Sequence, residues 1–156
     1  MTIRNTSKKD PGYNCFAWAA GDDTKWWEPG GRKYWPLPYP RKVDVAAIEA
    51  AYATLGYIAC ADGTLEPGFE KIAIFAIADQ PKHAARQFQN GVWTSKLGSD
   101  EDIEHDRVAE FPGLVAIRYG RVARFMKRAL PQGASPPQVT PPHAPGSAQN
   151  RPPGSP

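Results

Sequence analysis

The sequence predicts an α+β fold in which N-terminal helices pack on a small antiparallel sheet. Helical spacing of apolar residues is confined to the first third of the chain, and apolar runs typical of strands follow it. The pair Asn90-Gly91 favours a tight hairpin, which joins antiparallel strands. A chain of 156 residues with 41% hydrophobic residues suits one folded domain, which we place at residues 1–129.

Two helices are expected before the sheet. Residues 15–20 form a short helix that Gly21 ends, because glycine is favoured just past a helix C-terminus. Asp44 can cap a second helix over 45–55, which Gly56 ends. Its apolar residues recur at spacings of three and four: Val45, Ile48, Tyr52 and Leu55.

The strands follow in order. Residues 71–78 are almost all apolar, which predicts a buried central strand that Pro81 ends. The other predicted strands are 57–61, 82–89, 92–97 and a last pair, 114–119 and 121–127, on either side of Gly120.

Residues 130–156 form a proline-rich tail that we expect to be disordered. The segment from Pro131 holds nine of the 17 prolines and almost no large apolar side chain, so it cannot bury enough surface to offset its chain entropy. His143 lies in this tail and is therefore not a site candidate.

Composition narrows the range of functions. The net charge of +3 comes from scattered basic residues, so no nucleic-acid partner is expected. The chain shows neither a signal peptide nor an apolar run of about 20 residues, so we expect a cytoplasmic protein without a membrane partner. No cofactor or metal is expected, because the thiols and imidazoles lack zinc-ligand spacing: Cys15, Cys60, His83 and His105. The sequence leaves the oligomeric state open.

Cys15 is the candidate nucleophile. At an ordinary pKa only a few per cent of a thiol is ionised at pH 7, and a helix N-terminus with a neighbouring imidazolium raises that fraction. Cys15 opens the first predicted helix, and the exposed N–H groups of that turn could line an oxyanion site. Cys60, inside an apolar strand, is interpreted as a packed and inert side chain.

His83 is the candidate base, and a polar residue on the next strand would orient it. A two-residue turn at Asn90-Gly91 turns Ser95 away from His83, whereas a three-residue loop brings Ser95 to the same face. We favour Ser95 as the third residue. The alternatives that stay open are Thr94, Gln87, Asp102, Glu104 and His105.

The segment 25–40 is dense in aromatic residues and prolines. Trp26 and Trp27 could wall a substrate cleft beside Cys15. Alternatively, the segment is a long loop that packs its own aromatic side chains onto the sheet.

Several motifs resemble an uncharacterised bacterial domain of unknown function between about residues 11 and 128. These are YNCFAWAAGD (13–22), WWEP (26–29), LEPGFEKIAIFA (65–76), HAARQ (83–87), WTSKLG (93–98) and DIEH (102–105). A broader similarity is to papain-like cysteine peptidases, including the NlpC/P60 hydrolases. It implies a nucleophile at Cys15, a base at His83, a polar third residue, and oxyanion-assisting groups at Asn14 and Tyr13.

The functional expectation is a cysteine hydrolase that acts on a peptide or small-molecule acyl substrate through Cys15, His83 and Ser95. The alternative is a non-catalytic binding or regulatory module on the same scaffold. In that case Cys15 is buried and inert, and the aromatic segment exposes an apolar patch.

Overall fold

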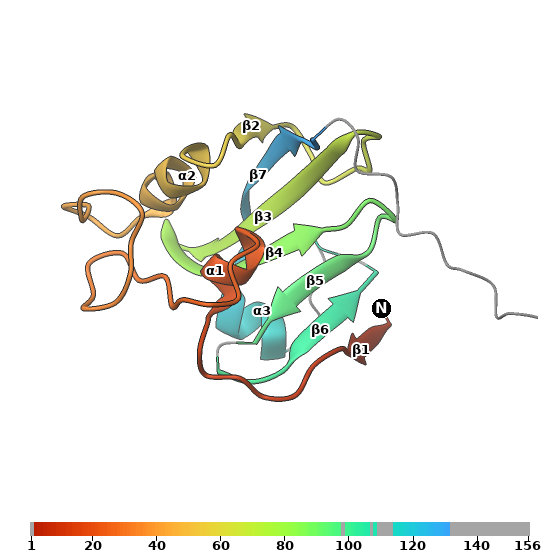
Figure 1. Ribbon diagram of the computed structural model, residues 1–156, viewed down its shortest axis with the longest axis horizontal. Coiled ribbons are helices and arrows are strands. Elements are labelled where there is room, and N and C mark those ends of the chain that lie inside the picture. Colours follow the sequence, from red (N-terminus) through yellow and green to blue (C-terminus); the bar gives the residue numbers. More distant parts are fainter. Residues whose placement is uncertain (1, 98, 107, 109–113, 132–156) are drawn as a thin grey trace, which may run out of the picture.

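The fold is built on one sheet of seven strands in which every neighbouring pair is antiparallel (Figure 1). The computed structural model describes residues 2–97, 99–106, 108 and 114–131. The strands, in their spatial order, are β1 (Ile3–Asn5), β6 (Asp102–His105), β5 (Trp93–Lys96), β4 (Gln80–Gln87), β3 (Phe69–Ile77), β7 (Arg121–Ala129) and β2 (Ile58–Cys60).

The predicted arrangement of N-terminal helices on a small sheet of papain-like plan is therefore wrong. Helices in the described residues are short: α1 (Cys15–Ala19), α2 (Val45–Ala53) and α3 (Leu114–Tyr119). The sheet is wider than expected because β1 and β6 extend it at one edge. Each of these strands is only three or four residues long, and Ile3 pairs with His105 across most of the chain, so local sequence patterns do not reveal them.

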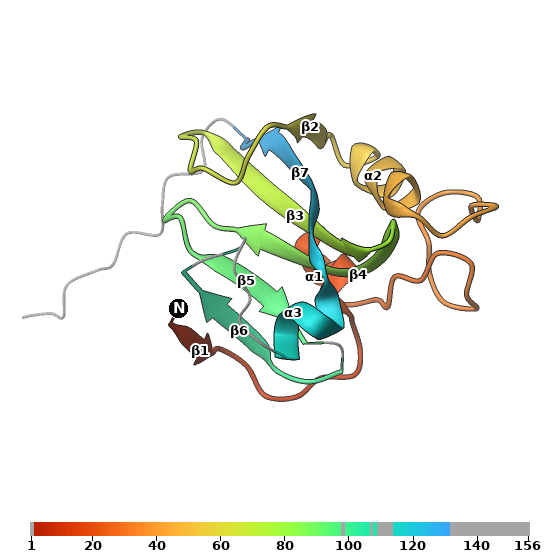
Figure 2. The ribbon, with the colours of Figure 1, turned by 180° about the vertical axis from the view of Figure 1, so that it is seen from behind.

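Helices cover both faces of the sheet. α1 and α2 lie in front of it in Figure 1, and α3 lies on the opposite face, as the reverse view shows (Figure 2). Residues of the central strand β3 alternate between the two cores, as pleating requires. Ile72 and Ile74 pack with α1 and α2, whereas Ala73 and Phe75 pack with Tyr119 of α3.

Capping residues set the two N-terminal helices, and both predicted helices are confirmed. The side chain of Asn14 accepts a hydrogen bond from the Ala17 N–H, which satisfies one of the unpaired donors of α1. The side chain of Asp44 accepts one from the Ala47 N–H at the start of α2. Each helix is followed by a glycine with positive φ, Gly21 or Gly56.

The β4–β5 hairpin has the register of the three-residue loop. Phe88 and Val92 close the loop through a backbone hydrogen bond, and Gly91 takes a φ of 84°. Ala85 consequently pairs with Ser95. Since directly paired residues share a face of the sheet, Ser95 lies on the same face as His83.

The predicted strand at 114–119 is a helix, α3. Alternating β-branched residues favoured a strand, and Gly120 suggested a turn between two strands. Gly120 has a φ of 78° and instead ends the helix, after which β7 enters the sheet between β3 and β2. This difference matters for the site, because α3 brings Tyr119 to the face that carries His83.

The predicted tail, residues 130–156, lies outside the described residues apart from Leu130 and Pro131. In the described ranges, no helix has the length and apolar character needed to cross a membrane.

Candidate active site

Cys15 begins α1, which packs against β4 and β5. The side chain is buried, with only 7% of the residue exposed. Burial raises the pKa of the Cys15 thiol to about 11, because a thiolate is disfavoured away from water. Hydrogen bonds from the backbone of Ala84, Phe16 and Cys15 itself act in the opposite direction and are outweighed. The thiol of the resting protein is therefore neutral at pH 7.

His83 lies in β4 and is fully buried. Its ring stacks on Tyr119 with centroids 4.5 Å apart and an interplanar angle of 29°, and Phe75 flanks it at 5.5 Å. Burial, with smaller contributions from the charges of His105 and Arg118, lowers the pKa of His83 to about 3. The imidazole of the resting protein is therefore neutral as well.

Ser95 connects His83 to a second histidine. The Ser95 Oγ lies 3.0 Å from His83 Nε2 and 2.9 Å from His105 Nε2, and all three residues are buried. A hydroxyl donates one hydrogen bond and accepts others, so Ser95 can donate to one imidazole while it accepts from the other. The three residues thus form one hydrogen-bonded row across β4, β5 and β6.

Cys15 and His83 both line one cavity of about 330 Å³. Of the other predicted site residues, it includes Asn14 and Trp26. Four residues in its wall were not predicted from the sequence: Phe16, Lys82, Arg118 and Tyr119. Arg118 and Tyr119 belong to α3. Because the sequence predicts a strand at 114–119, it offers no reason to place them at this cavity.

The side chain of Asn14 is hydrogen-bonded both to the start of α1 and to the backbone of Trp27. The Asn14 Oδ1 accepts from the N–H groups of Ala17 and Trp27, and its Nδ2 donates to the Trp27 carbonyl. The Trp27 indole N–H donates to Asp22, and its ring packs in the core against Trp35 and Tyr52. Trp26 thus lines the cavity, whereas Trp27 is a core residue.

Tyr13 belongs to a buried polar cluster beside the β5–β6 pair. Its hydroxyl donates to Asp102 Oδ2 at 2.7 Å, and Lys96 Nζ lies 4.6 Å from the centre of its ring. Lys96 also lies 3.9 Å from Asp102 Oδ1 and donates to the Asp100 carbonyl. The hydroxyl of Tyr13 is therefore bound to a carboxylate that is not part of the cavity lining.

The alternatives for the third residue have other partners. Only His105 among them joins the row through Ser95 in the described residues. The others bind as follows: Gln87 donates to the Gly63 carbonyl, Thr94 accepts from the Trp18 indole, Asp102 accepts from Tyr13, and Glu104 accepts from Arg4.

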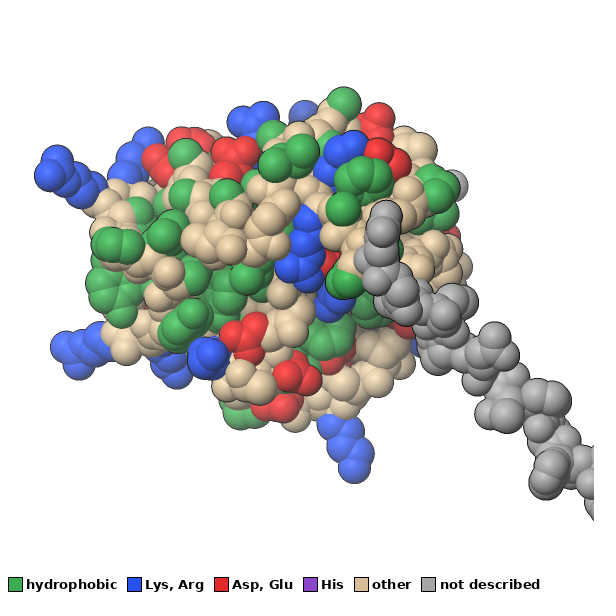
Figure 3. Space-filling view, turned by 45° about the horizontal axis from the view of Figure 1, so that its top comes forward, with side chains coloured by type: hydrophobic (Ala, Val, Ile, Leu, Met, Phe, Trp, Pro, Cys, Tyr) green, Lys and Arg blue, Asp and Glu red, His purple; other side chains and the backbone are tan. Residues whose placement is uncertain are grey.

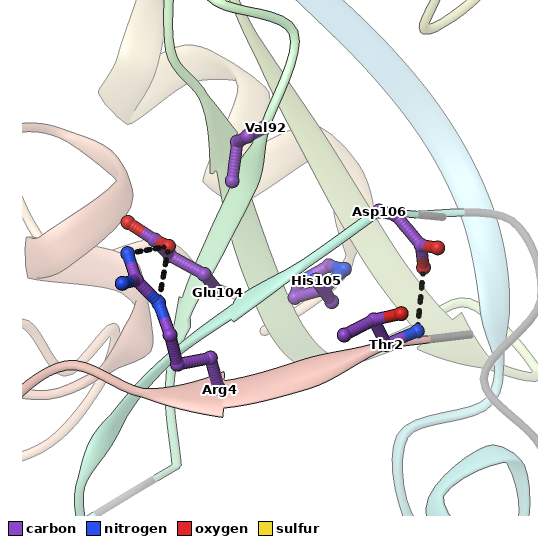
Figure 4. Close-up of a pocket in the computed structure, with 6 residues that line it drawn as sticks. All are labelled: Thr2, Arg4, Val92, Glu104, His105 and Asp106. Atoms are coloured by element: carbon purple, nitrogen blue, oxygen red, sulfur yellow. Dashed lines mark hydrogen bonds and ion pairs between the residues drawn. The ribbon is translucent and has the colours of Figure 1, made fainter.

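A second hollow, of about 190 Å³, borders His105 at the β1 edge (Figure 4). Its charged groups hold β1 on β6. Arg4 pairs with Glu104, with Nε 3.1 Å from Oε2, and the Thr2 N–H donates to Asp106 at 3.0 Å. We therefore interpret this hollow as a seam between strands.

The two cysteines are free thiols in different elements, Cys15 in α1 and Cys60 in β2. Cys60 lies in the edge strand β2, where its thiol donates to the Asp62 carbonyl. Across the portion of the chain that the structure describes, no three His, Cys, Asp or Glu side chains are grouped as metal ligands.

The protein is a β-rich domain in which Ser95 links His83 to His105. Cys15 is buried and lines the same cavity as His83. The chain belongs to the family described as "Domain of unknown function (DUF7689)", whose model matches residues 4–127. The predicted resemblance to an uncharacterised domain is thereby confirmed. No curated protein and no solved structure matches the chain, and the broader similarity to papain-like peptidases has no support.

Proposed function

We propose that the protein is a thiol-dependent acyl hydrolase with Cys15 as nucleophile and His83 as base. The observation that carries the proposal is the cavity shared by Cys15 and His83. The Ser95–His105 row supports it, because a catalytic imidazole needs a fixed orientation and tautomer. We also place the protein in the cytoplasm, where reducing conditions keep Cys15 as a thiol.

The proposed reaction proceeds through a thioester. Because His83 Nε2 is hydrogen-bonded to Ser95, Nδ1 is the nitrogen that takes the thiol proton. The sulfur attacks the acyl carbonyl, the bond to the leaving group breaks, and His83 returns the proton to that group. Water then gives a proton to His83 and attacks the thioester. The carboxylic acid leaves, and the sulfur takes the proton back.

This tautomer fixes the direction of the hydrogen bonds in the row. In the tautomer whose Nδ1 would accept the thiol proton, His83 Nε2–H donates to Ser95, and the Ser95 hydroxyl donates to His105 Nε2. Ser95 and His105 act through His83 and are positioning residues.

The buried setting of the pair determines which substrates react. The gap between pKa values of about 11 for Cys15 and about 3 for His83 corresponds to roughly 11 kcal/mol for moving the proton. Attraction between the resulting charges offsets part of this energy. A rate of about 10 s⁻¹ corresponds to a total barrier of about 16 kcal/mol. We therefore expect activated esters and thioesters to react and ordinary amides to react slowly.

Hydrolysis of p-nitrophenyl acetate, followed by mass spectrometry of the acylated protein, tests the proposal. We expect an acyl group on Cys15, a loss of about 1000-fold in kcat/KM in Cys15→Ala, and a loss of about 100-fold in His83→Gln. Cys60→Ser is the matched control and should keep wild-type activity. A Cys15→Ala protein that is as active as wild type, or acylation of Cys60 alone, contradicts the proposal.

The positioning role of Ser95 is tested by the kcat of its variants. Ser95→Ala should lower kcat about tenfold, and Ser95→Thr, which keeps the hydroxyl, should recover part of it. Equal kcat in the two variants would show that the hydroxyl does not act on His83.

A second candidate function is binding of a proline-rich segment by the loop after Trp27, which is residues 28–44 and leads to α2. Large apolar side chains of this loop are exposed, and hydrophobic side chains gather on the side of the molecule that carries it (Figure 3). They are Tyr34 (42% exposed), Leu37 (36%), Tyr39 (56%) and Val43 (43%). Exposed aromatic side chains recognise proline-rich peptides, and residues 131–156 of this chain have such a sequence.

Titration of the full chain with a peptide of residues 131–156, followed by tryptophan fluorescence, tests this second candidate. We expect saturable binding that weakens about tenfold in Tyr39→Ala. The control peptide has alanine at every proline. Equal binding of both peptides, or no saturation at millimolar concentration, rules the candidate out.

A further inference from the structure

The wall of the cavity that holds Cys15 and His83 is positively charged. Lys82 and Arg118 contribute cations, and none of its described lining residues is an Asp or a Glu. We infer that the acyl substrate of this site carries a carboxylate on its acyl chain. The inference rests on the proposed function and names the substrate class of that same site.

The partners of the two cations set them apart from most basic residues of the domain. Lys82 donates to the neutral Gln80 side chain at 3.3 Å, and the Arg118 guanidinium lies 5.4 Å from the centre of the Tyr119 ring. Nine of the other described basic side chains pair with carboxylates, whereas Lys25 and Lys33 lie over aromatic rings as Arg118 does. The nine are Arg4 with Glu104, Lys9 with Asp100, Lys42 with Asp44 and Asp79, Lys71 with Asp62 and Glu66, Arg86 and Arg128 with Glu70, Lys96 with Asp102, Arg124 with Glu49 and Lys127 with Glu66.

Lys82 and Arg118 are exposed side chains at the cavity wall, so water screens much of their attraction for an anion, and the apolar walls beside them reduce part of that screening. Phe16, Trp26 and Tyr119 provide such walls. A volume of about 330 Å³ is at the lower end of the range for small-molecule sites. A short acyl chain that ends in a carboxylate fits this combination of size and charge.

The carboxylate also acts on the chemistry. Arg118 is one of the charges that disfavour protonation of His83, which must accept the thiol proton during attack. A substrate carboxylate paired with Arg118 offsets this charge and makes the imidazolium easier to form. Part of the preference should therefore appear in kcat as well as in KM.

Two esters of matched length test the inference in the full-length protein: the mono-p-nitrophenyl ester of glutaric acid and p-nitrophenyl valerate. In both reactions the Sγ–acyl bond forms, the ester C–O bond breaks, and p-nitrophenol leaves with the thiol proton. Wild type should favour the glutarate ester at least about tenfold in kcat/KM, and the preference should shrink as salt is added.

Charge-removing variants assign the preference to the cavity. Lys82→Gln and Arg118→Gln should each reduce the ratio of the two kcat/KM values about three- to tenfold. Lys8→Gln removes an equal charge outside the cavity wall and should keep the wild-type ratio. A ratio near one in wild type, with both esters acylating Cys15, overturns the inference and leaves the proposed function standing. Failure of both esters to acylate Cys15 overturns the two together.

Discussion

Acidification from pH 7 to pH 4.5 is expected to lower the free energy of unfolding by about 2–3 kcal/mol through His83 alone. The pKa of buried His83 is lowered to about 3, whereas an unfolded histidine titrates near 6.5. Between these values the unfolded chain binds a proton that the folded protein does not. The contribution of neutral His83 to the free energy of unfolding is therefore complete above pH 6.5 and is lost as the pH falls toward 3.

Urea unfolding at a series of pH values, in wild type and His83→Gln, measures this contribution. The variant lacks the titrating group, so its stability should fall less steeply over the window from pH 7 to 4.5. Carboxylates contribute little there, because their ordinary pKa values lie near or below its lower limit. Parallel curves for the two proteins would show that His83 binds its proton equally well in the folded and unfolded states.

Among the glycines that the structure describes, Gly120→Ala is expected to be the most destabilising alanine substitution, by about 2–4 kcal/mol. Gly120 has a φ of 78°, which disfavours any residue with a Cβ. A Cβ at this position also overlaps the backbone carbonyl of Ala76, which cannot move without disturbing β3. Because Gly120 joins α3 to β7, the substitution should also displace Tyr119 from His83.

Gly56→Ala is the matched control for this prediction. Gly56 has a similar φ of 88°, but an added Cβ meets no atom within 4 Å. It should therefore lose only the conformational term, about 1 kcal/mol. Chemical unfolding of both variants separates strain from overlap. Equal losses in the two proteins would mean that the carbonyl of Ala76 has room to yield.

Local signals in the sequence predicted the elements that depend on few residues. The caps Asn14 and Asp44 mark both N-terminal helices, and the unbroken apolar run of β3 marks the centre of the sheet. The fold class was wrong because sheet width depends on distant pairing. β1 finds its partner in β6 about 100 residues away, and a three-residue exposed segment carries no periodic pattern.

The candidate site was partly predictable, because some of its residues also depend on local signals in the sequence. The alternation of a strand places His83 and Ser95 on one face once the hairpin loop is known, but Asn90-Gly91 is compatible with two loop lengths. The contribution of α3 could not be predicted. A helix of six residues rich in β-branched side chains reads as a strand, and its packing over His83 is a tertiary contact.

The side chain of Asn14 connects the start of α1 to the segment at Trp27. One amide both starts the helix that bears Cys15 and grips the backbone of Trp27 on both its N–H and its carbonyl. A molecule that shifts the loop after Trp27 must carry this amide along or break its bonds. A single side chain therefore couples the start of α1 to the position of the Trp27 backbone, so a substitution of Asn14 should loosen both.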